Sequence, residues 1–298
     1  HLVMSTQVNG NFDGDFPFRT TFPIGPEARQ LESPPTLPAL KSPLIRNPLV
    51  LAARVGSRMA WAGLGFVLYG LQLPAVLLRR PDWAAQLMTL ASAVALRALG
   101  VQVVVDDSQP SEQPGTPLVH IFNHRSPCDG LVIQAVLKLP GLTTAQLHLK
   151  WVLPGYAAAA RNAGSAVLDH RQPQSRLAGL MSASTLLRDH GEIMIAPNGS
   201  LVTPIEERVS SSAWMLAQHY GGSIVPWVFR YEELEGAVVV GTRHKPLRLL
   251  LSRLLAPLGT IHCRRGRSTD LKLPQDPRDL DGFSRAVQIY YREQKEYR

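Results

Sequence analysis

The segment NHRSPCD, residues 123–129, contains a histidine and an aspartate at a spacing that could support acid–base chemistry. A neutral imidazole at His124 can accept a proton from a hydroxyl group. A carboxylate at Asp129 can orient the ring and stabilise the imidazolium that forms. Because no protein nucleophile accompanies the pair, it suits direct attack by a substrate hydroxyl on a thioester. The segment therefore predicts a general base with a carboxylate partner.

The spacing alone is a weak signal, because the chain has nine histidines and an H-x4-D match is expected roughly 0.4 times by chance. Requiring Asn123 before the histidine and Ser126 two residues after it lowers that expectation to the order of one in two thousand. An alternative is that Asp129 only completes a capping box with Ser126 and that His124 is an ordinary loop residue. Capping accounts for Asp129, but it does not account for the Asn-His pair at the end of a strand.

The elements around the motif favour a functional position for it. Residues 118–122 are apolar and predict a strand, so His124 follows the carboxyl end, where α/β sheets present their ligands. Ser126 is a favourable N-cap and Pro127 a favourable first helical residue, so we expect a helix at 127–139. The partial positive charge of a helix N-terminus disfavours an imidazolium beside it and keeps the histidine neutral, as a base requires.

Strands and helices alternate along the rest of the chain from residue 101 onward. The predicted strands are 101–105, 118–122, 166–168, 192–196 and 224–229, and the further predicted helices are 174–190 and 210–220, with glycine after each of these two helices. This βα alternation predicts an α/β domain over 101–298, with a mixed, largely parallel sheet flanked by helices.

The segment before this domain divides into two parts. Residues 1–48 are rich in proline and small polar residues, which predicts a disordered or extended arm. Residues 49–100 include Met59–Leu78, twenty residues without a formal charge, which is about the length that crosses a bilayer. Pro74 inside this run favours a kinked or interfacial helix over a straight span. With a second helix following it, we expect a membrane-associating hairpin that enters one leaflet; a buried core helix is the alternative.

Composition restricts the partners of the chain. A net charge of +8 favours phosphate-bearing substrates and acidic lipid headgroups. We do not expect nucleic acid, since the chain has no zinc-finger spacing, no aromatic RNP-like strand and no long lysine run. Two cysteines cannot make a disulfide framework or a structural zinc site, so we expect no metal and a reducing, cytosol-facing location for the active site.

NHRSPCD resembles the NHxSxxD block of the glycerolipid acyltransferases, and the chain resembles the 1-acylglycerol-3-phosphate O-acyltransferase family. Segments similar to the family's later blocks follow in the same order: KWVLPG at 150–155, GSAVLDHR at 164–171, APNGS at 196–200 and IVP at 224–226. Only the first block is specific by itself, and the others gain weight from their order and spacing.

The resemblance implies an acyltransferase that uses acyl-CoA or acyl-carrier protein as donor, needs no cofactor, and acylates a lysolipid or glycerol-phosphate hydroxyl. It implies His124 as base, Asp129 as its partner and Arg171 as a contact to the acceptor phosphate, which a guanidinium can bind with two hydrogen bonds. Without the family, a solvated Arg171 is an equally good interpretation. We expect the other substrate contacts at Asn123, Ser126, Pro197, Asn198, Gly199 and Ser200. Membrane lipids are the expected partners, and the oligomeric state stays open.

The third block departs from the family. Asn198 stands where the family has glutamate, and Leu201 where it has arginine. Backbone N–H groups near Gly199 could still bind an anion. Because a carboxylate and a cation are missing from the usual acceptor site, the sequence leaves the acceptor open. It also allows two alternatives: a catalytically altered lipid-binding relative, and a thioester hydrolase that uses the same pair on water.

Overall fold

A computed structural model describes residues 48–78, 80–109, 112–126, 128–144, 160–161, 165–168, 173–199, 204–232 and 258–296. The predicted arm therefore lies outside the described residues, except for Pro48. The same is true of two predicted site residues, Arg171 and Ser200.

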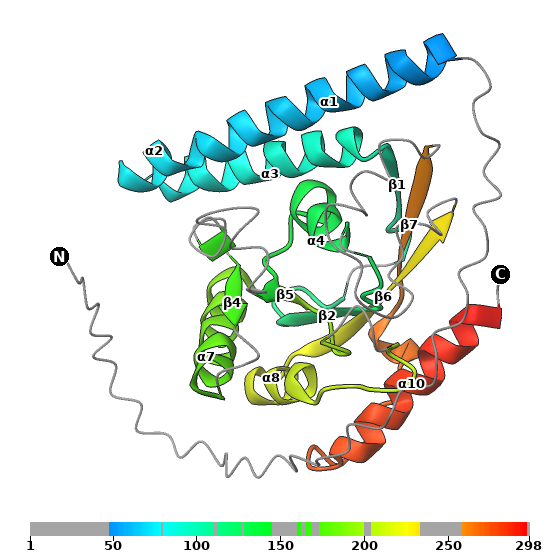
Figure 1. The fold of residues 1–298 in the computed structure, drawn as a ribbon. Helices are drawn as coiled ribbons and strands as arrows, with labels where there is room; N and C mark the ends of the chain where they lie inside the picture. Colours follow the sequence, from blue (N-terminus) through cyan, green and yellow to red (C-terminus); the bar gives the residue numbers. More distant parts are fainter. Residues whose placement is uncertain are drawn as a thin grey trace. The chain divides into compact units, whose positions relative to one another are not determined.

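The core of the chain is a five-stranded sheet (Figure 1). Its strands are β1 (Val101–Asp106), β2 (Leu118–Phe122), β5 (Glu192–Ile195), β6 (Ser223–Glu232) and β7 (Gly259–Arg265). They lie in the order β1-β7-β6-β2-β5, and only the β6–β7 pair is antiparallel. Two short strands, β3 (Leu142–Thr144) and β4 (Ala166–Leu168), pair in parallel as a second sheet. The predicted α/β fold with a mixed, largely parallel sheet is confirmed.

Strand β2 lies between β5 and β6 and is parallel to both. Ile121 pairs with Ile195 on one side, and Phe122 pairs with Trp227 on the other. Because the carboxyl ends of parallel strands meet at one edge of the sheet, the segments after β2 and β5 come close to the last residues of β6. That edge is where the motif at 123–129 lies.

Alternation along β2 divides the core between the two faces of the sheet. Val119 and Ile121, both fully buried, belong to a cluster with Leu187, Trp214 and Phe283. These three come from α7 (Pro173–His190), α8 (Ser212–Tyr220) and α10 (Leu280–Glu296). On the other face, Phe122 belongs to a cluster with Leu96, Val132 and Phe229. Leu96 comes from α3 (Pro81–Ala98), and Val132 comes from α4 (Asp129–Val132). The motif thus starts at a strand end whose neighbours on both faces are tightly packed.

The helix after the motif differs from the predicted one at 127–139. The α-helix α4 begins at Asp129 and ends at Val132, and Ile133–Leu137 continue it as a π-helix. The N–H of Lys138 donates to the carbonyl of Ile133 five residues earlier, at 2.7 Å, which widens the turn. Lys138 has φ of 55°, a left-handed conformation that ends the helix. The predicted regular helix is therefore wrong in its start, its length and its type.

In the described part of the chain, three helices precede the sheet: α1 (Pro48–Gly70), α2 (Gln72–Leu77) and α3. Helix α1 packs along α3, and α2 contacts both (Figure 1). The helix is interrupted at Leu71, directly after Gly70. Pro74 then lies in the first turn of α2, where a helix tolerates proline. Within the described ranges, no helix is both long enough and apolar enough to cross a membrane.

Candidate active site

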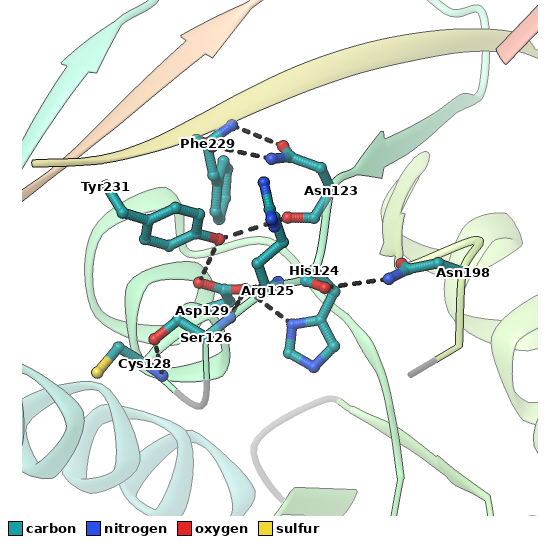
Figure 2. Close-up of polar contacts among 9 residues, drawn as sticks. All are labelled: Asn123, His124, Arg125, Ser126, Cys128, Asp129, Asn198, Phe229 and Tyr231. Carbon is teal, nitrogen blue, oxygen red and sulfur yellow. Dashed lines mark hydrogen bonds and ion pairs between the residues drawn. The ribbon is translucent and has the colours of Figure 1, made fainter. Parts of the chain in front are cut away.

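His124 and Asp129 are in direct contact at the carboxyl edge of the sheet (Figure 2). The distance from Nδ1 of His124 to Oδ2 of Asp129 is 2.8 Å. The side chain of Asp129 is fully buried, whereas that of His124 is 25 % exposed. The imidazole also packs edge-on against Phe122, with 5.6 Å between ring centroids. The aspartate is therefore inside the protein and the histidine is at its surface.

Four donors converge on the carboxylate of Asp129. Oδ2 accepts the N–H groups of Arg125 and Ser126 at 3.0 Å each, in addition to the imidazole. Oδ1 accepts the hydroxyl of Tyr231 at 2.9 Å. A proton on this carboxyl group would displace one of these donors, so the arrangement suits the carboxylate. With the carboxylate as acceptor, Nδ1 of His124 carries the ring proton.

The remaining ring nitrogen of His124, Nε2, is then the basic one. Figure 2 shows it pointing away from Asp129. Among the described residues, none lies in a hydrogen bond with it. This geometry provides a proton acceptor on a partly exposed side chain, with a buried carboxylate behind it, and general-base catalysis uses such a pair.

The contacts of Asp129 are compatible with both the capping interpretation and the catalytic one. The N–H of Ser126 donates to Asp129, which is half of a capping-box contact. The hydroxyl of Ser126 accepts the N–H of Cys128 at 3.2 Å. The same oxygen of Asp129 that binds Ser126 also binds His124. One side chain thus shapes the loop and orients the imidazole, so the two interpretations do not exclude each other.

Asn123 joins the motif to strand β6. Its Nδ2 donates to the carbonyl of Phe229, and its Oδ1 accepts the N–H of the same residue, both at 2.8 Å. The side chain thereby adds two ladder-like hydrogen bonds beyond the end of β2. We predicted Asn123 and Ser126 as substrate contacts. The amide of Asn123 is occupied by β6 and Ser126 is 1 % exposed, so the structure favours a positioning role for both.

Asn198 approaches the motif from the segment after β5. Its Nδ2 donates to the backbone carbonyl of His124 at 3.0 Å, and the residue is 3 % exposed. Gly199 follows with φ of 62°, and its N–H donates to Ala196 at 3.0 Å in a tight turn. The carbonyl of Pro197 accepts the N–H of Ser210 at 2.7 Å. Of the three described residues predicted from the third block, Asn198 is therefore the one in contact with the motif.

Burial affects two further ionisable groups beside Asp129. Burial raises the pKa of Tyr231 well above its usual value of 10, and the negative charge of Asp129 raises it further. Burial and then the same charge raise the pKa of Cys263 to about 12. At neutral pH both groups keep their protons, so Cys263 is not a thiolate nucleophile. In the described part of the chain, no three His, Cys, Asp or Glu side chains gather as metal ligands would.

Two comparisons with known proteins concern the domain at the centre of the chain and the fold. Residues 102–230 match a family model described as Acyltransferase. The fold resembles the crystal structure of PlsC, the 1-acyl-sn-glycerophosphate (LPA) acyltransferase from Thermotoga maritima, with a TM-score of 0.52 and 15 % identity. That match covers 82 % of this chain and 97 % of PlsC. No curated protein matches the chain significantly. Residues 102–230 therefore resemble an acyltransferase domain, and the chain shares the fold of PlsC.

Proposed function

We propose that the chain transfers a fatty-acyl group from a thioester donor to the hydroxyl of a lysolipid or glycerol phosphate. The match of residues 102–230 to the acyltransferase family model supports the reaction class. The observation that carries the mechanism is the 2.8 Å contact between Nδ1 of His124 and buried Asp129, which leaves Nε2 pointing away from the carboxylate on a side chain that is 25 % exposed.

In the proposed reaction, Nε2 of His124 accepts the proton of the acceptor hydroxyl while that oxygen attacks the thioester carbonyl carbon. Asp129 stabilises the imidazolium through the hydrogen bond at Nδ1. The tetrahedral intermediate then collapses, the carbon–sulfur bond breaks, and the imidazolium returns its proton to the departing sulfur. An ester and a free thiol result, and no protein nucleophile or cofactor takes part.

We propose that the acceptor carries a phosphate group. PlsC is named as an acyltransferase for 1-acyl-sn-glycerophosphate, and the two chains share a fold. The net charge of +8 favours anionic substrates. Arg171 stays the proposed contact to the phosphate, and Ser200 a proposed contact to the substrate. Acyl-CoA and acyl-carrier protein are both candidate donors.

We expect the purified chain to form an ester when it is given a labelled thioester and lysophosphatidate. The assay uses a panel of lysolipids and glycerol 3-phosphate as acceptors, with each acceptor tested against both donors. Products are separated as ester and free acid. Free acid in place of ester would support a thioester hydrolase instead. Lysolipid binding without any consumption of thioester would support a catalytically altered lipid-binding relative.

We further propose that α1 and α2 contact the surface of a lipid bilayer within one leaflet, with the active site on the cytoplasmic side. Large apolar side chains are exposed along these helices and in the turns that follow them: Leu64, Phe66, Val67, Leu71, Leu77 and Leu78. Exposed apolar side chains that are concentrated in one segment of the chain favour a membrane or protein contact there. The positive net charge favours anionic lipid among these partners.

Replacing Phe66 and Val67 with serine should lower binding to anionic phospholipid vesicles about tenfold or more, because each apolar side chain contributes on the order of 1.5–3 kcal/mol when it is buried. Flotation of the protein with vesicles measures the binding. Ile289→Ser is the matched control, since Ile289 on α10 is 51 % exposed and Phe66 is 56 % exposed. Equal flotation of both variants and the unaltered chain would contradict membrane contact through α1. A shift in oligomeric state alone would identify this face as a protein interface.

A further inference from the structure

Tyr231 connects strand β6 to the carboxylate of Asp129. Its hydroxyl donates to Oδ1 of Asp129 at 2.9 Å and lies 3.4 Å from the carbonyl oxygen of Asn123 (Figure 2). The other three donors to Asp129 all belong to the motif segment. Among the described residues, Tyr231 is the donor that reaches this carboxylate from a different strand. It lies outside every sequence block that suggested a function.

We propose that Tyr231 is a positioning residue that sets the proton affinity of His124 through Asp129. The proposal rests on the proposed function of His124 as a general base. A hydroxyl that donates to a carboxylate takes up part of its negative charge, and here it does so on the oxygen opposite the imidazole. With Tyr231 in place, Asp129 attracts the ring proton less strongly, and His124 stays neutral to lower pH.

The position of Asp129 does not depend on Tyr231 alone. Oδ2 keeps two backbone N–H donors and the imidazole, and the side chain is fully buried. Removing the tyrosine hydroxyl should therefore leave the carboxylate in place and change mainly its charge. For this reason we expect a change in pH dependence rather than a uniform loss of activity.

Among the described residues, the charges that act on Tyr231 are those of Asp129 in the motif and Cys263 on β7. Arg125 contributes through its backbone, and His124 contacts the same carboxylate. The raised pKa of Cys263 keeps that thiol neutral at the pH of the assay. Tyr231 packs against the apolar cluster that contains Leu96 of α3, and Leu99, directly after that helix, packs against the same cluster. Tyr231 itself stays neutral, because burial raises its pKa.

The test compares the unaltered chain with Tyr231→Phe across pH. In the variant, the midpoint of the acidic limb of the rate profile should move to higher pH by about 0.5–1 unit. The rate on the plateau at higher pH should change less than about threefold. The NMR titration midpoint of the His124 ring should move in the same direction. Tyr290→Phe is the control, since burial raises the pKa of Tyr290 to about 12 as well, but that residue is on α10 at the other face of the sheet.

A stronger donor should have the opposite effect. Incorporating a fluorinated tyrosine at position 231 preserves the contact and makes the hydroxyl more acidic, so both midpoints should move to lower pH. Unchanged midpoints, or a uniform loss of rate at every pH, would overturn the proposal. The NMR titration does not require turnover. If the unaltered chain transfers no acyl group, the proposed function fails while the assignment of Tyr231 is still decided.

Discussion

Replacement of His124 with alanine should lower the rate of acyl transfer about 10²–10⁴-fold, the usual contribution of a positioned general base. The imidazole is the exposed member of the pair, and its Nε2 is the atom that would take the proton of the acceptor. Without it, water is left to remove that proton. The measurement is the initial rate of labelled acyl transfer to the best acceptor of the panel, at saturating donor.

His124 gives a sharper test than its partner because the fold depends on Asp129. Removing the carboxylate would leave the N–H groups of Arg125 and Ser126 unpaired at a buried site. Loss of activity could then reflect a disordered loop. His190→Ala is a suitable control, since His190 is exposed at the end of α7. Undiminished transfer by His124→Ala, with an unfolding midpoint equal to that of the control, would rule out the base mechanism.

Several strands could be predicted because a short run of apolar residues is a local signal. Leu118–Phe122 and Ala166–Leu168 have the predicted bounds, and a glycine with positive φ follows α7 and α8 as expected. Strand β7 was missed, because polar residues such as His262 and Arg264 alternate with its buried ones. Helix α10 could have been found from Phe283, Val287 and Tyr290, which recur at helical spacing on its buried face.

In the site too, contacts within the motif could be predicted from the sequence, whereas contacts between distant segments could not. The contact of His124 with Asp129 spans five residues, so the motif itself suggested it. The contacts of Asn123 with Phe229 and of Tyr231 with Asp129 span 106 and 102 residues. They depend on the register of β2 against β6, and no local pattern specifies that register. The sequence marked Asn198 as unusual, but not its contact across 74 residues to the carbonyl of His124.

That contact predicts a large effect for Asn198→Asp, which preserves the shape of the side chain but loses the N–H donor. At neutral pH the new carboxylate would face the carbonyl oxygen of His124 in a position that is 3 % exposed. The unpaired carbonyl costs about 1–3 kcal/mol of unfolding free energy, and the desolvated charge adds to that cost. Acyl transfer should also fall, because the backbone at His124 loses its link to the segment after β5.

The pH dependence of this variant separates a lost hydrogen bond from a general disturbance. A buried carboxyl group has its pKa raised in the folded state, so the folded chain binds the proton more tightly than the unfolded chain does. The variant should therefore come closest to the stability of the unaltered chain near about pH 4, where the protonated group can donate to His124. It should lose stability as the pH rises toward neutral. Urea unfolding from pH 4 to 8 measures this difference. Asn198→Ala removes the donor without adding a charge, so its deficit should not change with pH. Equal stability and activity of Asn198→Asp and the unaltered chain at pH 7 would show that this amide does not hold the motif in place.

Asn198→Glu, which installs the family's residue, also lacks an N–H donor. We expect it to weaken the site, because in this chain the amide at position 198 donates to the backbone carbonyl of His124.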